Sequence, residues 1–380
     1  MRRALTGLIV LGAVFSPAPM RPQARWTVDA KPVVDIPGTT EKGDVAFGTA
    51  NWATRLASGT IVVADARAPG LRFFDGTGKR IRSAGCAGQG PGDFLTVTWV
   101  SQCAKDTLFA WDFLQSRVTV LDSTGNVART FPFGARGGSQ LISSCNRLGT
   151  LVQFGAARRV PPSTPPDPNA GYQILSMVAP IQLVDAIGNV TVTLGEVPVG
   201  EFLSGSTGRA SFGGMPRPLG RSTSMALSAD RLFVGTGDSA TVDAYALDGQ
   251  RVSSLTLRVA VRAPSEGQYE RAAQKLLSLM PGQMRETART WVLGIPMPAK
   301  LPPYTGLFSD PDGLVWAVLS VPGDKDTQLR AHRATGQVVA DVRVPVNLVV
   351  FEIGAGYILG VREDADGEQH VVMYRLHRAR

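Results

Sequence analysis

Histidine is the residue type most often used for acid–base chemistry, and this chain of 380 residues has three: His332, His370 and His377. Their spacing fits no helical metal motif, and no Gly-x-Ser-x-Gly segment leads into a helix. A Ser-His-Asp triad therefore has no support beyond the residue types themselves. A lyase would need a histidine beside an acid, for which His332 is the candidate. The sequence assigns no catalytic residue.

Two aspartates stand at matching places, each directly after an apolar run. Asp65 follows Ile61-Val62-Val63-Ala64, and Asp112 follows Leu108-Phe109-Ala110-Trp111. An aspartate at the end of a strand caps a loop by accepting backbone N–H groups. Two of them at the mouth of a central channel could also bind a cation such as Ca²⁺ through oxygen. Both interpretations stay open, and loop capping is favoured.

A glycine-rich segment runs from Gly88 to Phe94 (Gly-Gln-Gly-Pro-Gly-Asp-Phe). A phosphate-binding loop must open a helix whose N-terminal amides hold the phosphate. Here the segment leads into Val97-Thr98-Trp99-Val100, which has the composition of a strand. The glycines are therefore interpreted as a turn between two sheets.

Three cysteines, Cys86, Cys103 and Cys145, lack any CxxC or His-paired metal spacing. Cys103 lies five residues before Leu108 and Cys145 six before Leu151, so they hold nearly equivalent positions in consecutive repeats. In an oxidising compartment these two could form a disulfide and leave Cys86 as a free thiol. The alternative is that all three are small buried hydrophobic residues.

The elements that must position these residues recur along the chain. Each unit starts with a turn, which is followed by a strand of β-branched or aromatic residues. A loop and a second strand come next, and a turn of the Asp-Gly type ends the unit. With 44% hydrophobic residues, 42 Gly and 26 Pro, the composition excludes disorder and disfavours coiled coils. About six such units predict an all-β fold, a six-bladed β-propeller. A sandwich of unrelated hairpins would not explain the recurring order. The clearest units start at residues 57, 105, 148, 229, 310 and 354.

Two insertions interrupt the repeat. Residues 160–170 are rich in proline, which predicts an extended surface loop without ladder pairing. Residues 265–292, between the fourth and fifth units, have helical spacing. Ser265 is the expected N-cap with Gln268 three residues later, a capping box. We expect this short helical insertion to pack on the propeller surface.

The first 24 residues have the pattern of a signal peptide: Arg2 and Arg3, an apolar run to Phe15, and small residues with prolines. Cleavage is expected after Ala18 or Ala24, and residues 25–380 are expected to form one exported domain, periplasmic or secreted, without a stable membrane anchor. The formal net charge of +8 is scattered along the chain. Nucleic-acid binding, which needs a clustered basic face, is therefore not expected.

The segment from Trp26 to Phe94 resembles an exported bacterial family of six-bladed β-propellers related to NHL-repeat proteins. The resemblance rests on Gly59-Thr60-Ile61-Val62-Val63-Ala64-Asp65 and on the segment from Gly88 to Phe94, where Asp93 stands in place of the family's glutamate. Pro302-Pro303-Tyr304 and the run from Asp310 to Trp316 resemble the family's fifth blade. The resemblance implies the fold and leaves the activity open.

Tyr304 follows two prolines and precedes the fifth unit, which places it on an innermost strand near the channel. Its ring could pack there or contact a ligand. We expect a monomeric binding or interaction scaffold for a small molecule, glycan, peptide or protein. The alternatives are a Ca²⁺-dependent hydrolase or lactonase and, less favoured, a lyase. No set of metal-binding residues can be assigned, so the sequence identifies neither a bound Ca²⁺ nor a particular ligand.

Overall fold

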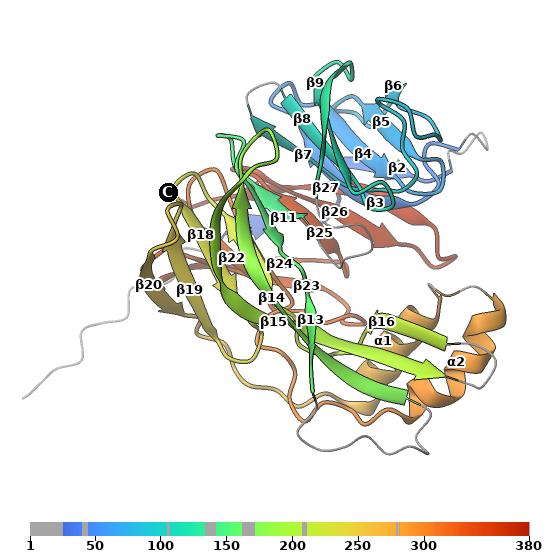
Figure 1. Cartoon of the computed structure of the whole chain (residues 1–380), viewed down its shortest axis with the longest axis vertical. Coiled ribbons are helices and arrows are strands. Elements are labelled where there is room, and N and C mark those ends of the chain that lie inside the picture. The colour runs from blue at the N-terminus through green and yellow to red at the C-terminus, as the bar shows by residue number, and fades with distance from the viewer. Residues whose placement is uncertain are drawn as a thin grey trace, which may run out of the picture.

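The computed structural model describes residues 26–39, 45–104, 107–133, 142–161, 172–206, 211–278, 280 and 282–379. The expected signal peptide (residues 1–24) and nearly all of the expected proline-rich loop (residues 160–170) lie outside these ranges. Within them the chain forms six antiparallel sheets and two helices (Figure 1).

Each sheet is built mainly from consecutive strands. The first contains β3 (Ala50–Arg55), β4 (Ile61–Asp65), β5 (Gly70–Phe74) and β6 (Arg80–Ala84). The second contains β7 (Val97–Ala104), β8 (Thr107–Asp112), β9 (Arg117–Asp122) and β10 (Val127–Pro132). The third contains β11 (Ile142–Cys145), β12 (Leu151–Phe154), β13 (Arg158–Val160), β14 (Tyr172–Val184), β15 (Val190–Ser206) and β16 (Ser211–Pro216).

The remaining sheets follow the same plan. The fourth contains β17 (Ser224–Leu227), β18 (Arg231–Gly235), β19 (Thr241–Ala246) and β20 (Arg251–Thr256). The fifth contains β21 (Gly306–Ser309), β22 (Val315–Val318), β23 (Thr327–His332) and β24 (Val338–Val344). The sixth contains β25 (Val349–Ile353), β26 (Tyr357–Glu363) and β27 (Gln369–His377), with β1 (Thr27–Val28) and β2 (Val34–Pro37) beside β27.

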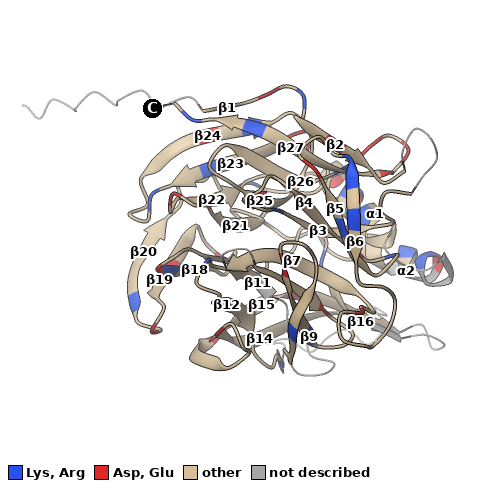
Figure 2. Cartoon of the chain, turned by 90° about the horizontal axis from the view of Figure 1, so that it is seen from above, with Lys and Arg blue, Asp and Glu red and all other residues tan. Residues whose placement is uncertain are grey.

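The first strands of the six sheets contact one another in a closed ring. β3 contacts β7, β7 contacts β11, β11 contacts β17, β17 contacts β21, β21 contacts β25, and β25 returns to β3. Seen from above, the sheets lie around this ring (Figure 2). Each sheet is therefore packed between two neighbours, which is the arrangement of a β-propeller.

This packing explains why the second strands of the sheets are predominantly apolar. All five residues of β4, Ile61 to Asp65, are buried, and every residue of β12 and β22 is buried as well. A strand covered on both faces gains from apolar side chains at every position. Between the first and second sheets, for example, Val62 and Phe73 share one cluster with Phe94 and Val100.

Asp-Gly turns connect the outer strands, as the sequence predicts. The N–H groups of Thr77 and Lys79 donate to Asp75 Oδ1 at 2.9 and 3.0 Å, and the Gly78 N–H donates to the Asp75 carbonyl. Gly78 has a φ of 90°, which a residue with a side chain rarely adopts. Asp122 and Asp185 form the same turn in the next two sheets.

The ring is closed by pairing the two ends of the chain. β1 pairs with β27 through Val28 and Leu376, and β2 pairs with β27 through Val34 and Met373. The prediction that the final strand shares a sheet with the N-terminal segment is thus confirmed. Because β27 then has neighbours on both sides, it leaves no free edge of its own.

The third sheet extends well beyond the others. β14 has 13 residues and β15 has 17, and their hairpin reaches the helices α1 (Glu266–Ser278) and α2 (Gly282–Gly294) (Figure 1). One detail of the predicted loop is wrong, because Val160 pairs with Ser176 as the last residue of β13. The first proline is residue 161, so the N–H of Val160 is still available for pairing.

The helices lie between β20 and β21 in the chain. The predicted capping box is present: the N–H of Gln268 donates to Ser265 Oγ, and the N–H of Ser265 donates to Gln268 Oε1. One face of α1 is apolar and buried, with Tyr269, Ala273 and Leu277 in one cluster with Leu219 and Val321. No helix in the described ranges is long and apolar enough to cross a membrane.

His332 gives a pH-dependent contribution to stability. It is completely buried on β23, and neither ring nitrogen has a hydrogen-bond partner among the described residues. Burial lowers its pKa to about 4. The ordinary value is about 6.5, so between these two pH values the unfolded chain binds one proton more than the folded chain. The contribution of His332 to the free energy of unfolding is therefore fully present above pH 6.5 and decreases as the pH falls towards 4.

We therefore expect the free energy of unfolding to decrease by about 3 kcal/mol between pH 7 and pH 4 through this group alone. In urea denaturation at a series of pH values, His332→Leu should reduce the slope of stability against pH. The matched control, His377→Leu at a half-exposed position, should leave most of the slope in place. An unchanged slope in His332→Leu would contradict this assignment.

Candidate functional site

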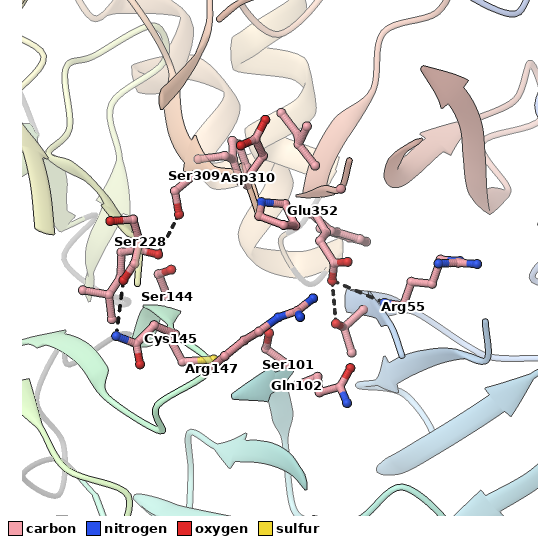
Figure 3. A pocket seen from close by; sticks show the side chains of 18 of the residues that line it. Arg55, Ser101, Gln102, Ser144, Cys145, Arg147, Ser228, Ser309, Asp310 and Glu352 are labelled. Carbon is pink, nitrogen blue, oxygen red and sulfur yellow. Dashed lines mark hydrogen bonds between the residues drawn. The ribbon is translucent and has the colours of Figure 1, made fainter. Parts of the chain in front are cut away.

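A cavity of about 500 Å³ lies where the first strands of the sheets end and turn into the second strands. All six sheets contribute lining residues (Figure 3). The polar lining side chains include Thr54, Arg55, Ser101, Gln102, Ser144, Arg147, Ser228, Ser309 and Glu352. Aromatic rings of Trp52, Trp99, Phe308 and Phe351 also line it. The size is that of a small-molecule site.

Glu352 is a half-buried acid that lines this cavity. It lies on β25, and Oε2 accepts hydrogen bonds from Thr54 Oγ1 at 2.5 Å and from the Arg55 N–H at 3.3 Å. The Tyr357 hydroxyl donates to Oε1. Burial raises the pKa of Glu352, although these three donors oppose the shift. The group is therefore easier to protonate than an exposed glutamate.

Tyr357 and Arg55 form one side of the Glu352 environment. The Arg55 guanidinium carbon lies 5.0 Å from the centre of the Tyr357 ring. Burial and the neighbouring Glu352 carboxyl raise the pKa of the Tyr357 hydroxyl, so it acts as a hydrogen-bond donor. Arg55 and Tyr357 also line a second hollow of about 370 Å³ next to the cavity.

On another side of the cavity, Asn146 holds a turn between β11 and β12. Its Oδ1 accepts the N–H groups of Leu148 and Thr150, both at 3.0 Å, and its Nδ2 donates to the Ser228 carbonyl in the next sheet. Asn146 is buried, but the neighbouring Arg147 is exposed and extends into the cavity (Figure 3).

A disulfide lies directly beside this turn. Cys103 on β7 and Cys145 on β11 are bonded, with their Cα atoms 5.3 Å apart. The bond joins the first strands of two neighbouring sheets. This agrees with the nearly equivalent positions of the two cysteines in consecutive repeats. Cys86 is a free, exposed cysteine whose thiol donates to Asp93 Oδ1 at 3.0 Å. This bond raises the pKa of the Cys86 thiol.

The structure places Asp65 and Asp112 away from the residues that line the cavity, at the opposite ends of their sheets. Both are buried. Asp65 accepts the N–H groups of Gly48, Thr49, Arg67 and Ala68. Asp112 accepts the N–H groups of Leu95, Thr96 and Gln115. These contacts correspond to the loop-capping interpretation.

Tyr304 lies just before β21 and is buried in the cluster between the fourth and fifth sheets. Its hydroxyl accepts the N–H of Gly237 at 3.3 Å, and burial raises its pKa to about 12. It does not line the cavity. In the described structure its ring packs against its neighbours, which was one of the two roles expected for it.

The glycine-rich segment is a turn that leads into a strand, β7. Its backbone carbonyls, at Gln89, Gly90 and Asp93, accept hydrogen bonds from the Arg117 guanidinium. A phosphate-binding loop would instead present N–H groups to an anion. These hydrogen bonds therefore agree with the interpretation of the segment as a turn between two sheets.

Sequence reasoning did not find Glu352, Arg55 or Arg147. One signal was available, because Glu352 is the single charged residue within the apolar strand Val349–Ile353. Arg147 likewise stands at a turn position at which four of the other repeats have Ala or Pro. Both signals become specific only when the repeats are aligned by their hydrogen bonds.

Comparison with known proteins gives no family: no family model and no curated protein matches this chain. Solved structures that are similar include a member of the DUF4221 family from Bacteroides vulgatus, at 11% identity and a TM-score of 0.49 over 94% of this chain and 100% of that one. A gluconolactonase from Xanthomonas campestris has 13% identity and a TM-score of 0.40 over 94% and 99%. The calcium-binding protein regucalcin from Agrobacterium tumefaciens has 10% identity and a TM-score of 0.36 over 94% and 97%.

Proposed function

We propose that this chain is an exported six-bladed β-propeller that binds a hydroxyl-rich molecule of sugar size in its central cavity. The observation that supports this most is the cavity of about 500 Å³, to which all six first strands contribute. Pockets of this volume bury most of the surface of a small ligand. A peptide or protein would have to reach it through a protruding side chain.

The chemistry of the lining supports a polar ligand. The hydroxyls of Ser101 and Ser144 have no hydrogen-bond partner among the described residues, and both side chains are half-buried. Such groups are available to pair with ligand hydroxyls, and pairing them would remove the cost of burying them. The half-buried rings of Trp52 and Phe308 add apolar surface against which the C–H face of a sugar can pack.

The acids of the cavity do not fit a calcium site, which would need several free oxygen ligands. Glu352 is engaged by Thr54, Arg55 and Tyr357. The buried acid Asp310 accepts a hydrogen bond from Trp316 Nε1 at 2.8 Å and pairs with Arg378 at 2.8 Å. In the described part of the chain, three potential ligands gather only at Asp364, Glu368 and His370, which do not line the cavity. These contacts favour binding over Ca²⁺-dependent hydrolysis.

A lyase is favoured still less, because His332 is buried outside the cavity. Export is supported by the pattern of residues 1–24 and by the Cys103–Cys145 bond, since disulfides persist in oxidising compartments.

The proposal is tested by isothermal titration of the purified chain with neutral and acidic mono- and disaccharides. At least one should bind, and Ala355→Trp should weaken that binding about tenfold or more, because Ala355 is exposed and lines the cavity. The matched control is Ala365→Trp, which adds the same ring at an exposed turn outside the cavity. The proposal is wrong if no sugar binds, or if Ala355→Trp binds as well as Ala365→Trp.

A further inference from the structure

Five turns that rim the cavity share one hydrogen bond. In each, the first residue donates its N–H to the carbonyl of the residue that closes the turn. These pairs are Leu56 with Thr60, Asn146 with Thr150, Ser228 with Arg231, Asp310 with Leu314, and Gly354 with Tyr357. Residues 105–106, between β7 and β8 in the chain, lie outside the described ranges. The shared bond aligns the residues of the five turns.

The residue after the donor is small in four of these turns and an arginine in the fifth. The four are Ala57, Ala229, Pro311 and Ala355, and the fifth is Arg147. All five line the cavity. The turns at Leu56 and Asp310 have the same length as the Asn146 turn and form without a long side chain at this position, so the backbone has no need of an arginine there. The Arg147 side chain therefore calls for another explanation.

The turn that carries Arg147 is firmly held. Asn146 is buried and binds two N–H groups of its own turn and a carbonyl of the neighbouring sheet. On the other side, Cys145 is tied to Cys103. The backbone of Arg147 is thus fixed at the cavity, so binding has to order only its side chain.

Arg147 has no acidic partner among the described residues, while every acid of the cavity has partners of its own. Glu352 is bound by Thr54 and Tyr357, Asp310 by Arg378, and Asp230 by Arg231. The Arg55 guanidinium lies over the Tyr357 ring, on the side of the second hollow. The cavity thus has an uncompensated positive charge at the Arg147 turn (Figure 3).

We propose that Arg147 binds a carboxylate of the ligand, so that the molecule held in the cavity is a sugar acid such as a uronate. This inference rests on the proposed function and names its ligand class. A guanidinium matches a carboxylate with two parallel hydrogen bonds, and one such pair balances one charge. A phosphate dianion would call for more than one cation.

The experiment compares D-glucuronate and D-galacturonate with D-glucose and D-galactose by isothermal titration calorimetry. In the unmodified chain each acid should bind about tenfold more tightly than its neutral sugar, as expected for one charge-assisted pair. Arg147→Gln should remove this preference, so that each acid and its neutral sugar bind with equal affinity. Arg333→Gln, which removes the same charge at an exposed turn away from the cavity, should keep the preference.

Equal binding of acids and neutral sugars would overturn this inference and leave the proposed function standing. A preference that survives in Arg147→Gln would overturn it too, as would tighter binding of glucose 6-phosphate than of glucuronate. If no sugar of either kind binds, the proposed function itself is wrong.

Discussion

Ending the chain after Gly367 should abolish the cooperative unfolding transition of the whole protein. This truncation removes β27, whose residues Val371, Val372 and Tyr374 are buried. β27 pairs with β26 on one side and with β1 and β2 on the other. Without it the N-terminal strands lose their partner and β26 becomes an open edge. The ring can then no longer be closed by the pairing of its two ends.

The measurement is thermal unfolding followed by far-UV circular dichroism, with binding of a hydrophobic dye to report exposed core. The matched control ends after His377, which keeps β27 and removes the contacts of Arg378 with Asp310, Asp312 and the Gly354 carbonyl. This control should unfold cooperatively at a lower temperature than the full chain. A chain ending at Gly367 that keeps the native transition would show that closure is not required.

The repeat could be predicted because it depends on neighbouring residues. A turn like that at Asp75 needs an aspartate whose side chain accepts nearby backbone N–H groups and a glycine three residues later. Both residues lie within the turn itself, so the local sequence is enough to predict it. The same holds for the capping box of Ser265 and Gln268. The pairing of β27 with β1 and β2 followed from the need to cover the edges of a closed ring.

The cavity could not be predicted in this way. Glu352 contacts Thr54, which lies 298 positions earlier in the chain, and the Asn146 turn bonds Ser228 in the next sheet. Such contacts depend on how sheets are rotated about the ring, and no local pattern encodes that rotation. The sequence pointed instead to Asp65 and Asp112, because strand ends are recognisable, and these residues serve their own loops.

The long hairpin of β14 and β15 was missed for a different reason. The proline-rich residues 160–170 interrupt the unit that starts at residue 148, and the shared repeat pattern predicts no strand longer than those of the other units. In the structure, β14 starts at Tyr172 and β15 continues to Ser206, so one pair of strands serves both the sheet and an extension toward the helices. A sequence repeat predicts the strand length that all copies have in common. The additional strand length of one copy is visible only in the structure.

Replacing Cys103 and Cys145 by alanine should lower the free energy of unfolding by about 4 kcal/mol, because the bond closes a loop of 42 residues in the unfolded chain. This is a large part of the 5–15 kcal/mol, roughly, that stabilises a typical domain. The site favours the bond, since the Cα atoms are 5.3 Å apart on neighbouring first strands.

Urea denaturation compares the unmodified chain, the double variant and Cys86→Ala, which is the control for loss of an exposed thiol. The control should be as stable as the unmodified chain, and adding a reductant should destabilise both of these but not the double variant. Titration of thiols in the denatured, unreduced protein gives a second readout. One thiol per chain, from Cys86, is the expected result, whereas three would mean that the bond is absent. The Arg147 turn adjoins Cys145, so the double variant should also bind acidic sugars less tightly if the bond helps to hold that turn in place.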